Sequence, residues 1–256
     1  MYKILVYPIK SLPPVEVPEA RITRSGGLEW DRVYVIKDAN GRIINGKRER
    51  RVHLIRARYS LREKKIYVSA CCSGEEAYRL DEPGDLERWL SGFLGYKVRL
   101  EYVEEGMPDD LKRRGPTIVA HATLVEVASW YEGHGWDIMQ ARLRFRANLE
   151  VAGVPAFWED TLYYGGDRGA RVYIGEAAFE GRGISARCVV PSRDPFTAAV
   201  TPGFQKDFAR RRKPMLKGKY PESDAGYRLV LNTITLHGSA GKTLRLFDPV
   251  RVEHTV

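Results

Sequence analysis

The sequence predicts an α+β fold that is rich in β-structure, a barrel built from bent strands. Two observations lead to this prediction. Short segments rich in β-branched and aromatic residues, several of them alternating apolar and polar, recur along most of the 256 residues and are bounded by Gly, Pro or Asn. Only a few segments carry apolar residues at helical spacing, and many short strands with few helices are typical of β-rich α+β proteins.

The first hundred residues are expected to form strands and one helix. An Asn-Gly step at residues 40–41 separates two β-rich runs, which is a hairpin signal. Residues 85–94 place leucines and aromatic residues at helical spacing and stop at Gly95, which predicts a helix. The strands expected in this part are residues 2–7, 33–37, 42–45, 54–61, 65–69 and 96–103.

Residues 104–116 are charged, poor in apolar side chains and bounded by Gly and Pro. This composition predicts a boundary, which divides the chain into a module at 1–106 and a domain at 107–256. In the second part we expect helices at 122–130 and 203–213, and strands at 148–152, 171–179, 227–236 and 243–252.

Composition restricts the setting in which the protein works. The chain has 42 Lys and Arg against 33 Asp and Glu, a net charge of +9, which suits either an anionic partner or a solvated basic surface. No apolar run approaches the roughly 18 residues of a membrane-spanning helix, and the first residues do not read as a signal peptide. Three cysteines cannot form a disulfide framework, which fits a reducing compartment. We therefore expect a soluble, cytoplasmic protein.

The segment from Arg142 to Asn148 is the most informative for binding. If it is extended, Arg144, Arg146 and Asn148 share one face, while Phe145, Ala147 and Leu149 point to the core. Two guanidinium groups and an amide on one face form a receptor for a phosphate or for the acceptor atoms of a heterocycle. The alternative is an edge strand with a charged outer face.

Cys188 follows Arg187, whose positive charge favours the thiolate form. A thiolate binds soft metals or attacks electrophiles, and the alternative is a small buried apolar residue. Cys71 and Cys72 have no His or further Cys at zinc-ligand spacing, so we interpret that pair as structural. Lys10 and Ser11 follow the first strand on a turn and would suit an anionic oxygen.

Several enzyme classes are excluded by their missing motifs. The sequence has no P-loop, no HExxH and no GxSxG, and its Gly-Gly pairs lack the strand-to-helix context of a dinucleotide fold. A basic run at residues 210–213 has no accompanying nucleic-acid-binding signature.

Taken in order, these segments resemble the MOSC family, named after the C-terminal domain of molybdenum cofactor sulfurases. The resemblance is greatest to the group of the mitochondrial amidoxime-reducing component and its bacterial relatives. In the N-terminal module the motifs are Tyr7-Pro-Ile-Lys-Ser11, Gly27-Leu28 and Asp31-Arg32. In the domain proper they are Arg144-Phe-Arg-Ala-Asn148, Phe157-Trp-Glu-Asp160, Ile174-Gly-Glu176 and Arg187-Cys188 with Asp194-Pro195. Ala147 stands where the family has proline, and an Arg of the family near the first hairpin matches either Lys47 or Arg48.

The resemblance implies an N-terminal β-barrel-like module packed on a MOSC β-barrel domain, with the molybdenum cofactor (Mo-molybdopterin) between the two. It implies Cys188 as the catalytic cysteine and molybdenum ligand. The residues that it implies around the pterin and its phosphate are Lys10, Ser11, Arg32, Thr123, Arg144, Arg146 and Asn148.

The activity implied is a molybdenum-dependent oxidoreductase that reduces small N-hydroxylated or N-oxygenated compounds. Electrons would come from a separate ferredoxin-like or cytochrome-like protein, because no iron–sulfur cysteine cluster follows residue 188. Two alternatives stay open: a cofactor carrier or sulfur-transfer protein without reductase turnover, and a basic β-barrel that binds nucleic acid. We expect neither a membrane nor a nucleic acid as the partner.

Overall fold

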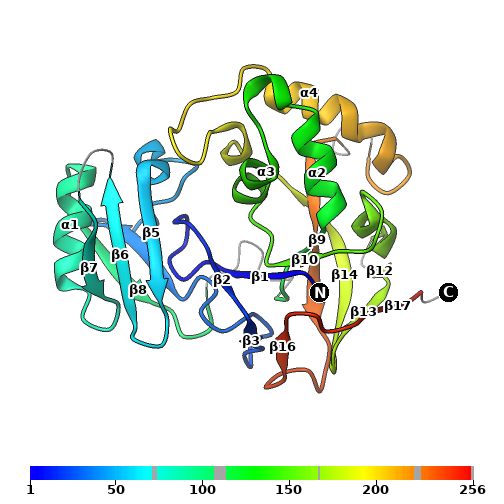
Figure 1. Ribbon diagram of the computed structural model, residues 1–256, viewed down its shortest axis with the longest axis horizontal. Helices are drawn as coiled ribbons and strands as arrows, with labels where there is room; N and C mark the ends of the chain where they lie inside the picture. The colour runs from blue at the N-terminus through cyan, green and yellow to red at the C-terminus, as the bar shows by residue number, and fades with distance from the viewer. Residues whose placement is uncertain (71–73, 107–113, 167, 222–225, 255–256) are drawn as a thin grey trace.

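The computed structural model describes residues 1–70, 74–106, 114–166, 168–221 and 226–254. It has two lobes (Figure 1). One lobe carries α1 and the sheets around β4 to β8, and the other carries the largest sheet together with α2, α3 and α4. Within these described ranges, the mixture of several sheets with four α-helices confirms the predicted β-rich α+β class.

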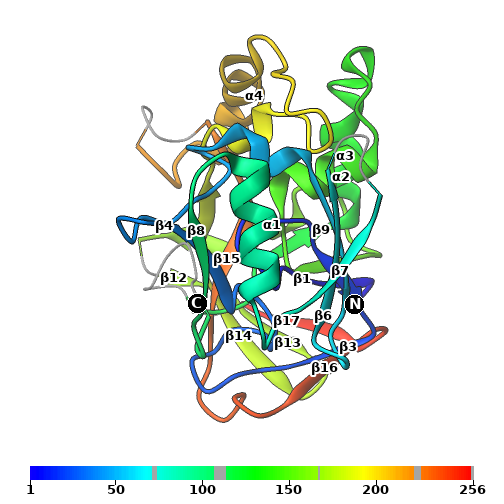
Figure 2. The same cartoon turned by 90° about the vertical axis from the view of Figure 1, so that its left-hand side faces the viewer.

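The described part of the smaller lobe has two small sheets and one α-helix, and Figure 2 shows this lobe from its own side. Its elements are β4 (Tyr34–Asp38), β5 (Ile55–Ser60), β6 (Lys65–Ala70), β7 (Glu76–Arg79), α1 (Gly84–Leu94) and β8 (Val98–Tyr102). Helix α1 buries Leu86, Leu90 and Leu94 in the core of this lobe, and it ends where Gly95 adopts a left-handed conformation at φ 74°. The predicted turn at the Asn-Gly step is confirmed, with one bridge between Lys37 and Ile43 in place of the strand expected at 42–45. The strands expected at 54–61 and 65–69 pair as β5 and β6, and the predicted helix is confirmed.

The larger lobe is organised on an eight-stranded sheet with the order β17-β13-β14-β15-β9-β10-β1-β2. The strands are β1 (Lys3–Val6), β2 (Val15–Val17), β9 (Ile118–Ala120), β10 (Leu149–Val151), β13 (Arg171–Ile174), β14 (Ala177–Ala186), β15 (Arg228–Thr235) and β17 (Val250–Glu253). The register of β14 shifts at Gly181–Gly183, where the long strand bends. Among the described residues this sheet does not close into a barrel.

Three helices, α2 (His121–Ser129), α3 (Ile138–Phe145) and α4 (Phe204–Arg212), enclose an aromatic core. Phe145 lies at the centre of that core, with ring centroids 5.3 Å from Phe208 and 6.5 Å from Trp136. Short pairs complete the fold: β3 (Glu19–Arg21) with β16 (Thr243–Arg245), and β11 (Tyr163–Gly165) with β12 (Arg168–Gly169). No helix in the described ranges has the length and apolar character needed to traverse a membrane.

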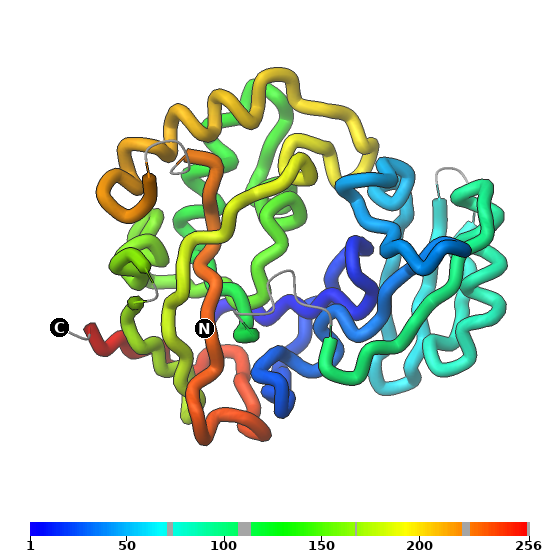
Figure 3. The backbone as a smooth tube through the Cα atoms, turned by 180° about the vertical axis from the view of Figure 1, so that it is seen from behind, coloured from blue at the N-terminus to red at the C-terminus, as the bar shows by residue number. Residues whose placement is uncertain are grey.

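The first residues of the chain join the two lobes. Strand β1 pairs with β10, and β3 pairs with β16 near the C-terminus, so residues 3–21 run along the larger lobe before the chain enters the smaller one (Figure 3). Ile4 and Ile22 are buried in the core of the larger lobe, with Leu149 and Phe179. The predicted boundary at residues 106–107 adjoins residues 107–113, which are outside the described residues, and it stays a prediction.

Three further local predictions are wrong. Residues 142–145 are not extended but form the end of α3, because Asp137 caps the helix by accepting from the Gln140 N–H and because Ala141 and Phe145, four residues apart, are both buried. Residues 171–179 form a hairpin rather than one strand, with the turn at Gly175. Residues 243–252 likewise divide into β16 and β17.

Candidate functional site

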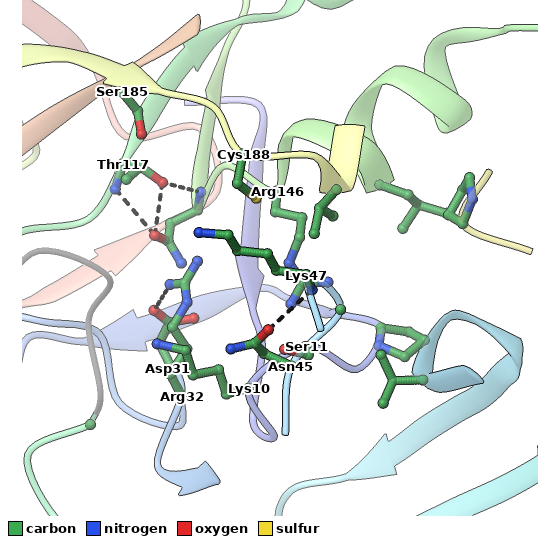
Figure 4. A pocket seen from close by; sticks show the side chains of 18 of the residues that line it. Lys10, Ser11, Asp31, Arg32, Asn45, Lys47, Thr117, Arg146, Ser185 and Cys188 are labelled. Atoms are coloured by element: carbon green, nitrogen blue, oxygen red, sulfur yellow. Dashed lines mark hydrogen bonds and ion pairs between the residues drawn. The ribbon is translucent and has the colours of Figure 1, made fainter. Parts of the chain in front are cut away.

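A cavity of about 1020 Å³ lies where the lobes meet, and both lobes line it. Figure 4 shows Lys10, Ser11 and Arg32 from the N-terminal part of the chain facing Arg146 and Cys188 from the larger lobe. The sequence predicted that the cysteine and the cationic side chains share one crevice, and the structure brings them together. The predicted site residues that line the cavity are Lys10, Ser11, Arg32, Arg146, Asn148 and Cys188.

Cys188 lies just after the end of β14 and is exposed. The backbone on either side of it is held in place. Tyr227 donates its hydroxyl proton to the Cys188 carbonyl over 2.9 Å, and Arg187 donates a guanidinium N–H to the Phe145 carbonyl over 2.8 Å. These bonds fix the main chain that carries the sulfur, while the sulfur itself faces the cavity (Figure 4).

One buried ring, Tyr7, packs against two of the cations of the cavity. The guanidinium carbon of Arg146 lies 4.1 Å from its ring centroid, and that of Arg32 lies 5.1 Å from it. Burial raises the pKa of Tyr7 to about 12, an effect that the neighbouring Arg146 and Arg32 partly offset. The neutral phenol donates to the Ala147 carbonyl over 3.1 Å. The ring therefore positions both guanidinium groups at the cavity wall.

Arg146 is the residue that ends α3, and its φ of 53° places it in the left-handed region. The turn directs its side chain away from the helix and toward the start of the chain, where it donates to the Leu12 carbonyl over 3.0 Å. Arg32 has a similar φ of 57° and forms an ion pair with Asp31. Both cations depend on backbone conformations that are unusual for residues with a side chain.

Asn148 stabilises the cavity wall through the hydrogen bonds of its side-chain amide. Its side-chain oxygen accepts from the Thr117 N–H and hydroxyl, over 3.1 and 2.9 Å, and its amide nitrogen donates to the Leu5 carbonyl over 3.1 Å. Only 2% of the residue is exposed. The amide therefore joins β1 to the strands beside it and orders the wall.

Lys47 is the side chain that the sequence left ambiguous with Arg48, and it lines the cavity beside Arg146 (Figure 4). Asn45 sets it there, because the Asn45 side-chain oxygen accepts from the backbone N–H groups of Lys47 and Arg48 over 3.1 and 3.2 Å. Sequence reasoning missed Asn45 and Thr117, although an Asn two residues before a lysine in a loop signals this kind of turn.

Thr123 and Arg144 do not line the cavity as the structure describes it. Thr123 is fully buried and donates to Glu159 over 2.9 Å. Arg144 donates to the Pro191 carbonyl over 3.0 Å and lies 3.3 Å from the Asp194 carboxylate, and burial lowers its pKa to about 10. The expectation that Arg144 and Arg146 share one face is wrong, because Arg144 lies within α3 whereas Arg146 follows the helix in a left-handed conformation that directs its side chain elsewhere.

The described residues contain no group of three or more His, Cys, Asp and Glu side chains that could hold a metal ion. Cys71 and Cys72, which we interpreted as structural, lie outside the described residues. Among the described residues that line the cavity, Cys188 offers the one sulfur, with cationic side chains around it. Such a donor set suits an anionic group that brings its own metal, rather than a metal held by a cage of protein ligands.

Comparison with known families identifies the N-terminal part of the chain. Residues 1–81 match the family model of the MOSC N-terminal beta barrel domain. These residues belong to the MOSC family. Within the cavity, the MOSC N-terminal domain supplies Lys10, Ser11, Arg32 and Lys47. A MOSC domain is consistent with a function associated with the molybdenum cofactor. The comparison with curated proteins finds no matching relative.

Proposed function

We propose that the protein binds the molybdenum cofactor in this cavity and reduces small N-hydroxylated compounds with electrons from a separate donor protein. One observation supports the proposal most strongly: the exposed sulfur of Cys188 shares one cavity with the cationic side chains of Lys10, Arg32, Lys47 and Arg146. These side chains come from both lobes, as the cofactor site between two modules of this family would require.

The donor set of the cavity fits the cofactor. A cysteine thiolate is the metal-binding form of the residue, and arginine forms paired hydrogen bonds with phosphate. A volume of about 1020 Å³ is at the upper end of the range of roughly 300–1,000 Å³ that ligand pockets have, which gives room for a cofactor and a substrate. When bound, the cofactor would supply two-electron redox chemistry next to Cys188.

The chain itself would bind and orient the reactants. Arg146 and Arg32, held by Tyr7, would bind the phosphate, and Lys10 and Lys47 would add positive charge around the anion. The reaction breaks the N–O bond of a hydroxylamine: R–NHOH, two electrons and two protons give R–NH₂ and water. The electrons come from the donor protein and the protons from solvent.

The test uses protein produced in a host that makes the cofactor. We expect stoichiometric molybdenum in the purified protein and reduction of an N-hydroxy compound with an artificial electron donor. In the variant Cys188→Ser, which keeps the shape of the side chain, turnover should be lost while the circular dichroism spectrum and melting temperature are unchanged. Retained turnover would contradict the role of Cys188 as ligand.

The same preparation separates the alternatives. Stoichiometric molybdenum without turnover of any N-hydroxy compound would make the protein a carrier of the cofactor. Salt-sensitive binding of oligonucleotides by the metal-free protein, with no molybdenum taken up, would favour a nucleic-acid-binding barrel.

A further inference from the structure

One wall of the cavity is apolar and is not used by the proposed cofactor contacts. We define the apolar arm as Val52, Ile55, Val190, Pro195 and Phe196, all of which line the cavity. Val52 and Ile55 have no exposed surface, so a ligand would contact Val190, Pro195 and Phe196. It lies beside the cysteine loop, because Val190 is two residues after Cys188. A side-chain carbon placed on Gly46 would lie 3.5 Å from a Val190 methyl and 2.8 Å from the His53 imidazole, so the two lobes are in close contact at this point.

Phe196 is the exposed aromatic residue of the apolar arm, with 38% of its surface accessible. Its position is nevertheless fixed. The N–H groups of Phe196 and Thr197 both donate to the Asp194 carboxylate over 2.8 Å. Arg56, from the smaller lobe, donates to the Phe196 carbonyl, and its guanidinium carbon lies 5.0 Å from the ring centroid. The hydrogen bonds hold the Phe196 backbone and Arg56 contacts the ring, so the ring can stack on a flat ligand with less loss of side-chain entropy than an unrestrained one.

The network of contacts that fixes Phe196 includes the buried Arg144, which takes no part in the proposed cofactor contacts. Asp194 accepts from the Gln140 side chain over 2.8 Å and forms the ion pair with the buried Arg144. Arg144 also donates to the Pro191 carbonyl, in the turn between Cys188 and Asp194. This network ties the segment between Cys188 and Phe196 to α3.

We propose that the apolar arm binds the organic substituent of the substrate and that Phe196 makes it selective for a flat aryl group over a saturated ring of similar size. This inference rests on the proposed function. Both kinds of ring bury apolar area against Val190 and Pro195, but only an aryl group gains a stacking contact with Phe196. That contact is expected to favour the aryl ligand roughly three- to tenfold in affinity.

The test measures binding without turnover and without metal. Benzamide and its saturated counterpart cyclohexanecarboxamide are titrated into protein with ¹³C-labelled Ile and Val methyl groups, and the shifts of Val52, Ile55 and Val190 give the dissociation constants. Phe196→Leu keeps an apolar side chain and removes the ring. Phe247→Leu is the matched control, because Phe247 is 83% exposed and does not line the cavity. Melting temperatures show that each variant is folded.

We expect Phe196→Leu to weaken benzamide binding roughly three- to tenfold, to leave the saturated amide unchanged and so to abolish the preference. Phe196→Tyr, which restores a ring, should restore the preference, and Phe247→Leu should leave it intact. An equal loss for both amides, or no loss, would overturn the proposal. A protein that shows this aryl preference but reduces no N-hydroxy compound would contradict the proposed function alone.

Discussion

Replacing Arg146 tests two properties of this residue separately: its left-handed backbone conformation and the positive charge that it places at the cavity wall. Arg146→Ala removes the hydrogen bond to the Leu12 carbonyl and the contact with the Tyr7 ring, which together contribute about 2 kcal/mol to stability. The φ of 53° stays a left-handed conformation that is unfavourable for alanine. Arg146→Gly loses the same contacts but relieves that strain.

The difference between the two variants can be estimated. A residue with a side chain is about 1–2 kcal/mol less stable in the left-handed region, and glycine loses about 0.5–1 kcal/mol more backbone entropy on folding. The net effect of about 1 kcal/mol makes Arg146→Gly melt roughly 2–4 °C above Arg146→Ala. Differential scanning calorimetry measures this shift.

Both variants lose the same cation from the cavity wall. If Arg146 binds the phosphate of the cofactor, the loss of about 1.5–3 kcal/mol weakens binding about ten- to a hundredfold, and molybdenum per protein falls equally in the two. Lys64 is the matched control, because it also has a φ of 53° but does not line the cavity. Lys64→Gly should melt above Lys64→Ala, and both should bind molybdenum fully.

Two outcomes would refute this reasoning, and they refute different parts of it. Equal melting temperatures for Arg146→Ala and Arg146→Gly would mean that residue 146 is not left-handed. Full molybdenum content in both would mean that this guanidinium does not hold the cofactor.

Two further predictions concern the groups that support the site. Arg142→Met removes the guanidinium that lies 2.7 Å from the buried Glu150 carboxylate, while the His121 imidazole stays 2.6 Å from it. The free energy of unfolding in urea titrations should therefore fall by about 1.5–3 kcal/mol. A loss no larger than that of Arg245→Met, at an exposed ion pair, would contradict this. Burial, with the nearby Asp160 charge second, raises the pKa of Glu159 to about 7. The folded state therefore keeps a proton that the unfolded state releases, so this group makes stability fall as the pH rises from about 4.5 to 7. Glu159→Gln should flatten that fall, and parallel pH profiles of wild type and variant would show that Glu159 does not cause it.

Local elements could be predicted from the sequence because their signals are local. The leucine spacing and final glycine of α1, and the Asn-Gly turn after β4, each decide the conformation of a few neighbouring residues. Segment 142–148 shows the limit of such signals. Its alternating charges fit a strand, whereas the packing of Phe145 against Phe204 and Phe208, some sixty residues away, favours the helix.

The site could be predicted only in part for the same reason. The convergence of Cys188 with Lys10 and Arg32 followed from a family resemblance across the chain, since no spacing rule relates residues so far apart. The same resemblance assigned Arg144 and Arg146 one role, and the turn at the end of α3 gave them different ones. Arg146 faces the cavity, while Arg144 is buried against Trp136 and Asp194. A left-handed residue at position 146 has no signal in the sequence Arg-Phe-Arg-Ala.

The geometry of the cavity depends on the pairing of two distant stretches of chain. Leu5 donates its N–H to the Asn148 carbonyl over 2.7 Å, and Ile4 stands opposite Leu149 in the sheet. Lys10 follows the first of these stretches and Arg146 precedes the second, so the strand pairing fixes how far apart the two cations lie. The smaller lobe cannot rotate away from the larger one without breaking the bond that Arg56 donates to the Phe196 carbonyl and the bond that Arg193 donates to the Gly46 carbonyl. The cavity is therefore preorganised, and its cationic wall is in place before any anion enters.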